Sequence, residues 1–184
     1  MENINVYNNT IYGVGWSGIV LDTTGAANGG NGLRKNIYIH HNTIYTIWGD
    51  GGAGIYITTN NIENIAIRNN IIYVGKYNGQ IVAATPEIAA KITAQYNLVY
   101  GSKLCVSYHP NCVEMGNRAT NITANPMFIN LVTPDLHLLP SSPAIDAGVE
   151  DGTRDDLDGI RRPQGDGFDI GAYEVVFFEK QQVK

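Results

Sequence analysis

The stretch Asn36-Ile37-Tyr38-Ile39-His40-His41-Asn42-Thr43-Ile44-Tyr45 decides the fold, because variants of it recur along the chain. Residues 3–12 and 64–73 repeat its order of apolar, Tyr and Asn positions, and a shortened copy ends at Tyr100. The recurring Asn is separated by steps of 33, 28 and 27 residues, at Asn9, Asn42, Asn70 and Asn97, and Asn125 extends the series by 28. A repeat of this length predicts an array of stacked structural units.

Each repeat contains three short segments with the properties of β-strands. Ile37 and Ile39 alternate with Tyr38, residues 43–45 follow a turn, and residues 54–57 form a third apolar segment. The segments are rich in Ile, Val and Tyr, whereas Gly, Asn and Thr separate them, as β structure prefers. Three strands in every stacked repeat predict an all-β parallel β-helix. We expect one short helical turn, at residues 85–91.

The recurring Asn has a structural interpretation in such a stack. Successive coils of a parallel solenoid lie ~4.8 Å apart, and an Asn amide offers both hydrogen-bond donors and an acceptor. An unsatisfied buried polar group costs ~1–3 kcal/mol, so equivalent amides gain by bonding to one another. We therefore expect an asparagine ladder along the stack, with ligand binding as the alternative role, made of Asn9, Asn42, Asn70 and Asn97.

Composition limits the class of protein. The 184 residues are 43% hydrophobic and only 16% charged, with a net charge of −5, which fits one folded domain rather than a disordered chain. Basic residues form no stripe, so nucleic acid is not an expected partner. No apolar run approaches the ~20 residues that span a bilayer. The chain opens inside a repeat and has no signal peptide at its start, so we expect it to be the C-terminal part of a longer protein. We also expect a monomer.

The domain organisation follows from where the repeats stop. We expect coils over residues 1–139, with an excursion at 101–120 and a return to the solenoid at 121–139, and a closing segment of the same domain at 140–184. Residues 175–178 are apolar and predict a terminal strand against the last coil. The excursion holds Cys105 and Cys112 with His109 between them, which leaves a disulfide, free thiols and a metal site open as alternatives.

The closing region carries a resemblance to a known family. In order, it contains Asn-Pro-Met-Phe-Ile from 125, Asp-Leu-His-Leu from 135, Ser-Pro-Ala-Ile-Asp-Ala-Gly from 142 and Asp-Ile-Gly-Ala-Tyr-Glu from 169. This set resembles the C-terminal region of secreted bacterial β-helix proteins of the pectate-lyase-like superfamily. The resemblance implies a right-handed, single-stranded parallel β-helix of about five or six coils. It also implies a secreted or cell-surface location and a polysaccharide as partner.

The loops between the second and third strands are candidates for sugar binding. Trp16, Trp48 and Tyr77 take similar places in successive coils, and a row of flat rings can pack against sugar rings. Polar neighbours that could contact hydroxyl groups are Asp22, Asp50 and Lys76. The alternative is that these rings anchor the loops on the sheet edge, since aromatic side chains usually bury much of their area.

Two other columns are candidates for exposed faces. The third strands are expected to point Val20, Tyr56 and Val82 outward, a face without the acidic ligands and Arg or Lys base that the resemblance implies for a lyase. The second strands are expected to point a column of Tyr side chains outward. We favour packing between these rings over ligand binding as the role of this column. Its members are Tyr12, Tyr45, Tyr73 and Tyr100.

The turn column is where His and Arg adjoin across coils. His40, His41 and Arg68 are candidates for acid–base catalysis there, although the column has no carboxylate pair of the glycosidase type. A solvated turn face is the alternative. The residues aligned at this position are Tyr7, His40, Arg68 and Gln95.

An acidic, Gly-containing loop at 151–159 is a candidate cation site. Its carboxylates are of the type that binds Ca²⁺, but the bidentate Glu of an EF-hand is missing. Pairing with Arg154, Arg161 and Arg162 is the alternative. The candidate ligands are Asp151, Asp155, Asp156 and Asp158.

The sequence therefore predicts an extracellular carbohydrate-active protein that binds a polysaccharide and could cleave it as a lyase or hydrolase. A non-catalytic glycan-binding or structural module is the alternative. No cofactor is required by this prediction, and Ca²⁺ is an optional one.

Overall fold

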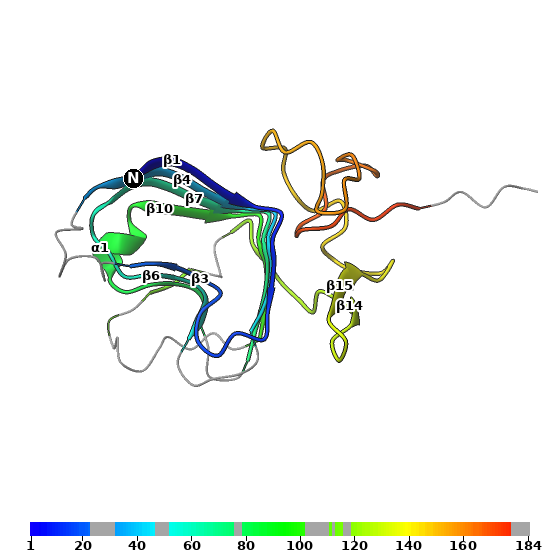
Figure 1. Cartoon of the computed structure of the whole chain (residues 1–184), viewed down its shortest axis with the longest axis horizontal. Helices are drawn as coiled ribbons and strands as arrows, with labels where there is room; N and C mark the ends of the chain where they lie inside the picture. Colours follow the sequence, from blue (N-terminus) through cyan, green and yellow to red (C-terminus); the bar gives the residue numbers. More distant parts are fainter. Residues whose placement is uncertain are drawn as a thin grey trace, which may run out of the picture.

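A computed structural model describes residues 1–22, 32–46, 52–75, 79–101, 111, 113–115 and 119–177. It is mostly β structure, built around three sheets (Figure 1). The first sheet has the order β1 (Glu2–Tyr7), β4 (Arg34–His40), β7 (Ile62–Arg68) and β10 (Ile92–Gln95). The second has β2 (Thr10–Tyr12), β5 (Thr43–Thr46), β8 (Ile71–Val74), β11 (Leu98–Gly101) and β13 (Ile122–Thr123). The third has β3 (Ile19–Leu21), β6 (Ala53–Ile57), β9 (Gly79–Ala83) and β12 (Val113–Glu114).

The chain visits the three sheets in turn, which places each repeat beside the next. Strand pairing is parallel throughout the three sheets except for β12 against β9. Equivalent residues pair across repeats, because Ile37 lies opposite Ile4 on one side and Ile65 on the other. The prediction of an all-β chain with parallel sheets is confirmed.

The core lies between the three sheets and consists mainly of stacked Ile and Val. Ile39, Ile44 and Ile55 are fully buried members of one cluster to which every sheet contributes. The column that we expected on the outward face of the third strands is exposed at one of its three residues. Val20 is 44% exposed, but Tyr56 and Val82 are 3% and 0% exposed and belong to the buried cluster.

The expected helical turn is confirmed as α1 (Pro86–Ala89). The Thr85 side chain accepts a hydrogen bond from the Ile88 N–H, and Pro86 follows it at the start of the helix. Both features are typical of a helix N-terminus, where the first N–H groups lack partners within the helix. The helix buries Ile88 and Ala89 against the core.

The predicted asparagine ladder is present at the turn between the first and second strands of each coil. In every rung the Oδ1 atom of one Asn accepts from both the backbone N–H and the side-chain amide of the Asn before it. The distances are 3.1 and 2.9 Å between Asn42 and Asn70, and 3.0 and 2.9 Å between Asn70 and Asn97. Asn42, Asn70 and Asn97 are fully buried, so the ladder satisfies polar groups that water cannot reach.

The ladder ends at a different residue from the one predicted. Asn97 donates to Oδ1 of Asn121 at 2.8 and 3.0 Å, whereas Asn125 bonds locally to the Met127 N–H. The step from Asn97 to Asn121 is 24 residues, shorter than any earlier step. After residues 101–120, the chain rejoins the second sheet at β13, which pairs with β11. Residues 128–138 form an antiparallel hairpin of β14 (Phe128–Asn130) and β15 (Asp135–Leu138) instead of a coil.

The segment after β13 covers the outer face of the second sheet (Figure 1). A second apolar cluster joins Tyr45, Ile71 and Leu98 of that sheet to Phe128 and Leu138 of the hairpin. Within the Tyr column, ring centroids of Tyr45 and Tyr73 lie 5.1 Å apart and those of Tyr73 and Tyr100 lie 4.9 Å apart. The packing role predicted for this column is therefore observed at these three tyrosines.

The end of the described chain forms no strand, so the predicted terminal strand is wrong for residues 175–177. A buried ion pair holds this region instead. Arg162 donates to Glu174 at 2.7 Å, and both side chains have no exposed surface. Arg162 also donates to the backbone oxygens of Asp169 and Gly171, so the guanidinium fixes three points of the closing segment.

The ladder generates the first prediction. Asn70→Ala removes the acceptor for two Asn42 donors and leaves the backbone oxygens of Ile39 and Arg68 without their amide donor. We expect the free energy of unfolding to fall by about 3 kcal/mol, because each orphaned buried group costs ~1–3 kcal/mol. Urea denaturation followed by circular dichroism measures this change.

The matched control is Asn64→Ala. Asn64 belongs to an exposed Asn column in which its amide donates to Asn36 at 2.8 Å. Because water replaces an exposed partner, its loss should change the free energy of unfolding by less than about 1 kcal/mol. Equal effects of the two substitutions would contradict a structural ladder.

The hairpin generates a second prediction, at His137. Its ring nitrogens lie 2.6 Å from Asp135 and 2.9 Å from Asp158. Partial burial lowers the pKa of His137, but the hydrogen bonds to Asp158 and Asp135 outweigh burial and raise it overall. A raised pKa stabilises the folded chain below the unfolded pKa of about 6.5, and this stabilisation disappears as the pH rises through the folded value.

We therefore expect the stability difference between the native chain and His137→Gln to be largest near pH 6 and to shrink towards pH 9. Thermal melts across this pH range give the comparison. At low pH the difference also shrinks, because His137 lowers the pKa of Asp135 and that carboxylate must then be protonated. A stability difference between the native chain and His137→Gln that increases above neutral pH would contradict a stabilising ion pair at His137.

Candidate functional site

The turn between β4 and β5 directs two consecutive histidines to the same side. Successive residues of an extended strand point to opposite faces. His41, however, has a φ of +48°, which ends the strand and reverses this alternation. As a result, Nδ1 of His40 and Nδ1 of His41 lie 3.5 Å apart, with the ring planes at 77°.

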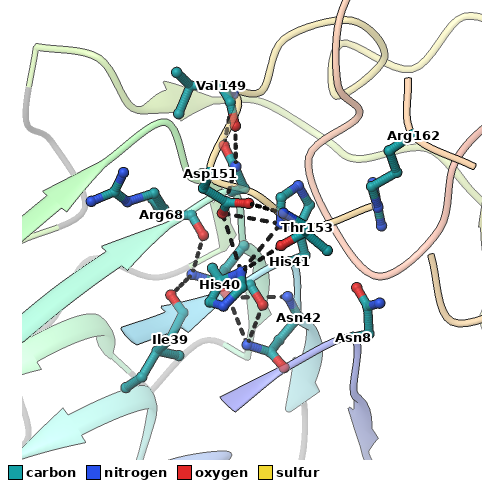
Figure 2. A network of polar contacts seen from close by, with 12 residues as sticks. Asn8, Ile39, His40, His41, Asn42, Arg68, Val149, Asp151, Thr153 and Arg162 are labelled. Atoms are coloured by element: carbon teal, nitrogen blue, oxygen red, sulfur yellow. Dashed lines mark hydrogen bonds and ion pairs between the residues drawn. The ribbon is translucent and has the colours of Figure 1, made fainter. Parts of the chain in front are cut away.

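Both imidazoles meet one carboxylate from the closing segment (Figure 2). Oδ2 of Asp151 lies 3.1 Å from Nδ1 of His40 and 3.3 Å from Nδ1 of His41. The Thr153 hydroxyl lies 3.1 Å from the same nitrogen of His40. The three side chains of His40, His41 and Asp151 are almost wholly buried, with 11%, 0% and 6% exposed. We call these three residues the His–His–Asp cluster.

Neighbouring groups fix the carboxylate in place. The Asn69 amide donates to Oδ2 of Asp151 at 3.3 Å and to the backbone oxygen of Val149 at 2.7 Å. Asn69 Oδ1 in turn accepts from the Val149 N–H, and the Thr153 N–H donates to Oδ1 of Asp151. The loop carrying Asp151 is therefore bonded to the turn of a coil 80 residues earlier in the chain.

Burial and nearby charges set the protonation of the cluster. Burial lowers the pKa of His41, and the positive charge of Arg162 adds to this, against the opposing effect of Asp151. Burial alone would raise the pKa of Asp151, but hydrogen bonds from His40 and His41 dominate and hold it well below its usual range. The cluster thus contains an ionised carboxylate beside a buried imidazole that favours its neutral form.

A cleft of about 510 Å³ opens next to the cluster. One wall comes from the first coil, with Asn5, Tyr7 and Asn8, and the other comes from residues 151–156 of the closing segment. His40 lies at the junction of the two walls. The Tyr7 ring, which is 49% exposed, stacks on His40 with centroids 5.1 Å apart and planes at 5°. The cleft is therefore polar, with one exposed aromatic ring.

Residues 1–107, more than half of the chain, match the family model described as "Disaggregatase related". The chain belongs to this family. Searches for similar curated proteins and for similar solved structures found no match. Within the described residues, the disaggregatase-related chain has no helix of the length and apolar character that membrane crossing requires.

The disaggregatase-related chain brings together three candidates that the sequence placed in one column. His40 and His41 contact each other, and Arg68 lines a smaller cavity of about 210 Å³ with His40 and Asp151. The Arg68 guanidinium points away from Asp151 in Figure 2. The alternative of a solvated turn face is wrong at His40, which is 9% exposed because the closing segment covers it.

The predicted aromatic row is only partly within the described residues. Trp16 is 54% exposed on the loop between β2 and β3. Asp22 accepts a hydrogen bond from the Thr58 hydroxyl at 2.5 Å, which is a contact between coils. The positions outside the described residues are Trp48, Asp50, Lys76, Tyr77, Cys105, His109 and Cys112.

The four acidic candidates for a cation site have separate partners. Asp151 joins the histidines, and Asp158 contacts His137. Asp156 accepts from the N–H groups of Asp158, Ile160 and Glu174, which orders the closing loop. Asp155 lies 3.9 Å from Arg161. Among the described residues, Asp151 is the one of these four carboxylates that belongs to a group of three potential metal ligands, with His40 and His41, whose ligand atoms all lie within 4.8 Å of one another.

The contribution of Asp151 to the His pair was not visible in the sequence. The sequence signal that could have indicated it is the unusual residue at the turn. Asn8 and Asn69 occupy the position of His41 in neighbouring coils, with φ values of 51° and 55°. His tolerates this backbone region as Asn does, so the signal is only the change from an amide to an imidazole at this position.

Proposed function

We propose that this chain is an extracellular carbohydrate-active protein, built as a right-handed parallel β-helix of the pectate-lyase-like type, that binds a polysaccharide. The cleft beside the His–His–Asp cluster carries the proposal. Its lining combines an exposed aromatic ring, Tyr7, with amide and carboxylate groups such as Asn5 and Asp155. These groups suit sugars, whose hydroxyls hydrogen-bond to amides and carboxylates and whose C–H faces pack on aromatic rings.

The size of the cleft also supports this proposal. A volume of about 510 Å³ falls within the ~300–1,000 Å³ usual for small-molecule sites, and the walls are largely preformed by backbone hydrogen bonds. The Asn8 amide donates to the backbone oxygen of Asp155 at 2.7 Å, which joins the two walls across one end. The family description names a disaggregatase, a word for an enzyme that separates aggregated material. A polysaccharide that holds such material together is the substrate class we propose.

Cleavage is the further part of this proposal. His40, His41 and Arg68 are the candidates for acid–base chemistry, with the Asp151 carboxylate holding the imidazoles in place. A non-catalytic glycan-binding module is the second candidate, and the complete burial of His41 favours it, since a buried ring cannot reach a substrate directly. Analysis of the products separates the two, because a lyase releases unsaturated sugars, a hydrolase releases reducing ends and a binding module releases neither.

Affinity electrophoresis through gels containing acidic and neutral polysaccharides tests the binding site. We expect one polymer to retard the native chain, and Tyr7→Ala to weaken that retardation about tenfold, which corresponds to ~1.4 kcal/mol of binding free energy. The matched control is Tyr12→Ala, because Tyr12 is similarly exposed, at 55%, but lies outside the cleft lining.

A Trp16→Ala/Trp48→Ala variant tests the competing site on the loops that follow the second strands. Retention of binding in this variant, with loss in Tyr7→Ala, supports the cleft. The reverse result places the polysaccharide on the Trp loops and removes the cleft from the proposal. Equal migration of every variant and the native chain in all gels contradicts polysaccharide binding by this chain.

A further inference from the structure

We propose that His40, His41 and Asp151 bind one divalent transition-metal ion of the zinc class. The ligand atoms are Nδ1 of each imidazole and Oδ2 of the carboxylate, which form a mutual triangle. This inference concerns the chain's own residues and does not depend on polysaccharide binding.

The sides of the triangle match tetrahedral coordination. Zinc binds His nitrogen and carboxylate oxygen at about 2.0–2.1 Å, so two ligand atoms of a tetrahedron lie about 3.3–3.4 Å apart. The observed separations are 3.5 Å between the two nitrogens, and 3.1 and 3.3 Å from them to the oxygen. Adjacent ligands of an octahedral ion at the same bond length would lie about 3.0 Å apart, which is shorter than all three.

Without a metal, the two Nδ1 atoms share one carboxylate oxygen, and Nδ1 of His40 also lies 3.1 Å from the Thr153 hydroxyl. Oδ2 of Asp151 faces the two imidazole nitrogens and also the Asn69 amide, whereas Oδ1 accepts from the Thr153 N–H. Without a metal, both imidazoles would have to share this one oxygen as their acceptor. A metal ion would use both nitrogen lone pairs and balance the carboxylate charge at once.

The choice of metal follows from the ligand types. Two imidazoles and one carboxylate suit zinc and related transition metals, whereas Ca²⁺ prefers six to eight oxygen ligands. All three ligand atoms lie within 4.8 Å of one another, and the His41 side chain is fully buried. The calcium expectation for residues 151–158 is thereby replaced, at Asp151, by a site of different chemistry.

Outer contacts hold Asp151 and His40, whereas the buried Nε2 of His41 has no hydrogen-bond partner among the described residues. Asn69 and Thr153 each hold Asp151 by one hydrogen bond, and Tyr7 stacks on the His40 ring. Such outer contacts orient ligands before the metal arrives. Three protein ligands leave a fourth tetrahedral position. Because His40, Asp151 and Thr153 line the cleft, water or a substrate hydroxyl could reach the metal from there.

The test titrates metal-stripped full-length chain with Zn²⁺ by isothermal calorimetry and with Co²⁺ by visible absorption. We expect one ion per chain and the intense Co²⁺ bands of a tetrahedral site. His41→Asn, which installs the residue of the neighbouring coils at this turn, should weaken binding at least about 100-fold, since outer contacts alone contribute 10–100-fold. Asp151→Asn, which keeps the shape of the side chain, should do the same.

Two controls separate this site from other ligands of the chain. His137→Gln removes a histidine outside the cluster, and Cys105→Ser/Cys112→Ser removes both thiols, so each should bind Zn²⁺ like the native chain. Circular dichroism confirms that the His41→Asn and Asp151→Asn variants keep their fold. The proposal is overturned if the native chain binds no Zn²⁺ or Co²⁺, if the cluster variants bind as tightly as the native chain, or if the thiol variant loses the site.

Discussion

The structure depends on satisfying the polar groups of one turn in every coil. Each coil bends between its first and second strands, and that bend carries backbone groups into the interior where water is excluded. The Asn of each coil uses Oδ1 to accept from the coil before it, and its amide to bond the backbone of its own and the preceding coil, as Asn70 does with Arg68 and Ile39. A buried amide that bonds in both directions fixes the register of the stack, because a one-residue slip would orphan every rung.

The same bend explains why a chemical site can arise there. The residue before the ladder Asn has a positive φ in four coils, at Asn8, His41, Asn69 and Tyr96. This conformation turns its side chain away from the regular alternation of the strand, towards the surface that the closing segment covers. Asn69 uses the position to hold the backbone of Val149, and His41 uses it to reach Asp151. The ladder is thus the scaffold, and the preceding residue is free to vary.

The repeats in the sequence predicted the sheets and the ladder. Features that depend on contacts between residues far apart in the chain were not predicted. The repeated segments, separated by steps of 33, 28 and 27 residues, identified the sheets and the ladder through Asn97. Asn121 was not predicted as a rung, because the earlier steps pointed to Asn125, but the last coil is shorter and the chain continues into the hairpin after it. Tyr56 and Val82 alternate correctly for an outward face, yet both are buried. Alternation gives the direction of a side chain and not what covers it.

The position of the cluster makes the site composite. The family match covers residues 1–107, which includes both histidines and Tyr7, whereas the carboxylate comes from the closing segment at residue 151. The coils alone therefore present two imidazoles at a turn. The closing segment supplies the Asp151 carboxylate, forms the second wall of the cleft and buries the two imidazoles. Because Arg162 and Glu174 fix that segment, the geometry at Asp151 depends on an ion pair outside the cleft lining. The His–His–Asp cluster thus requires both parts of the chain, although the repeats by themselves account for the three sheets.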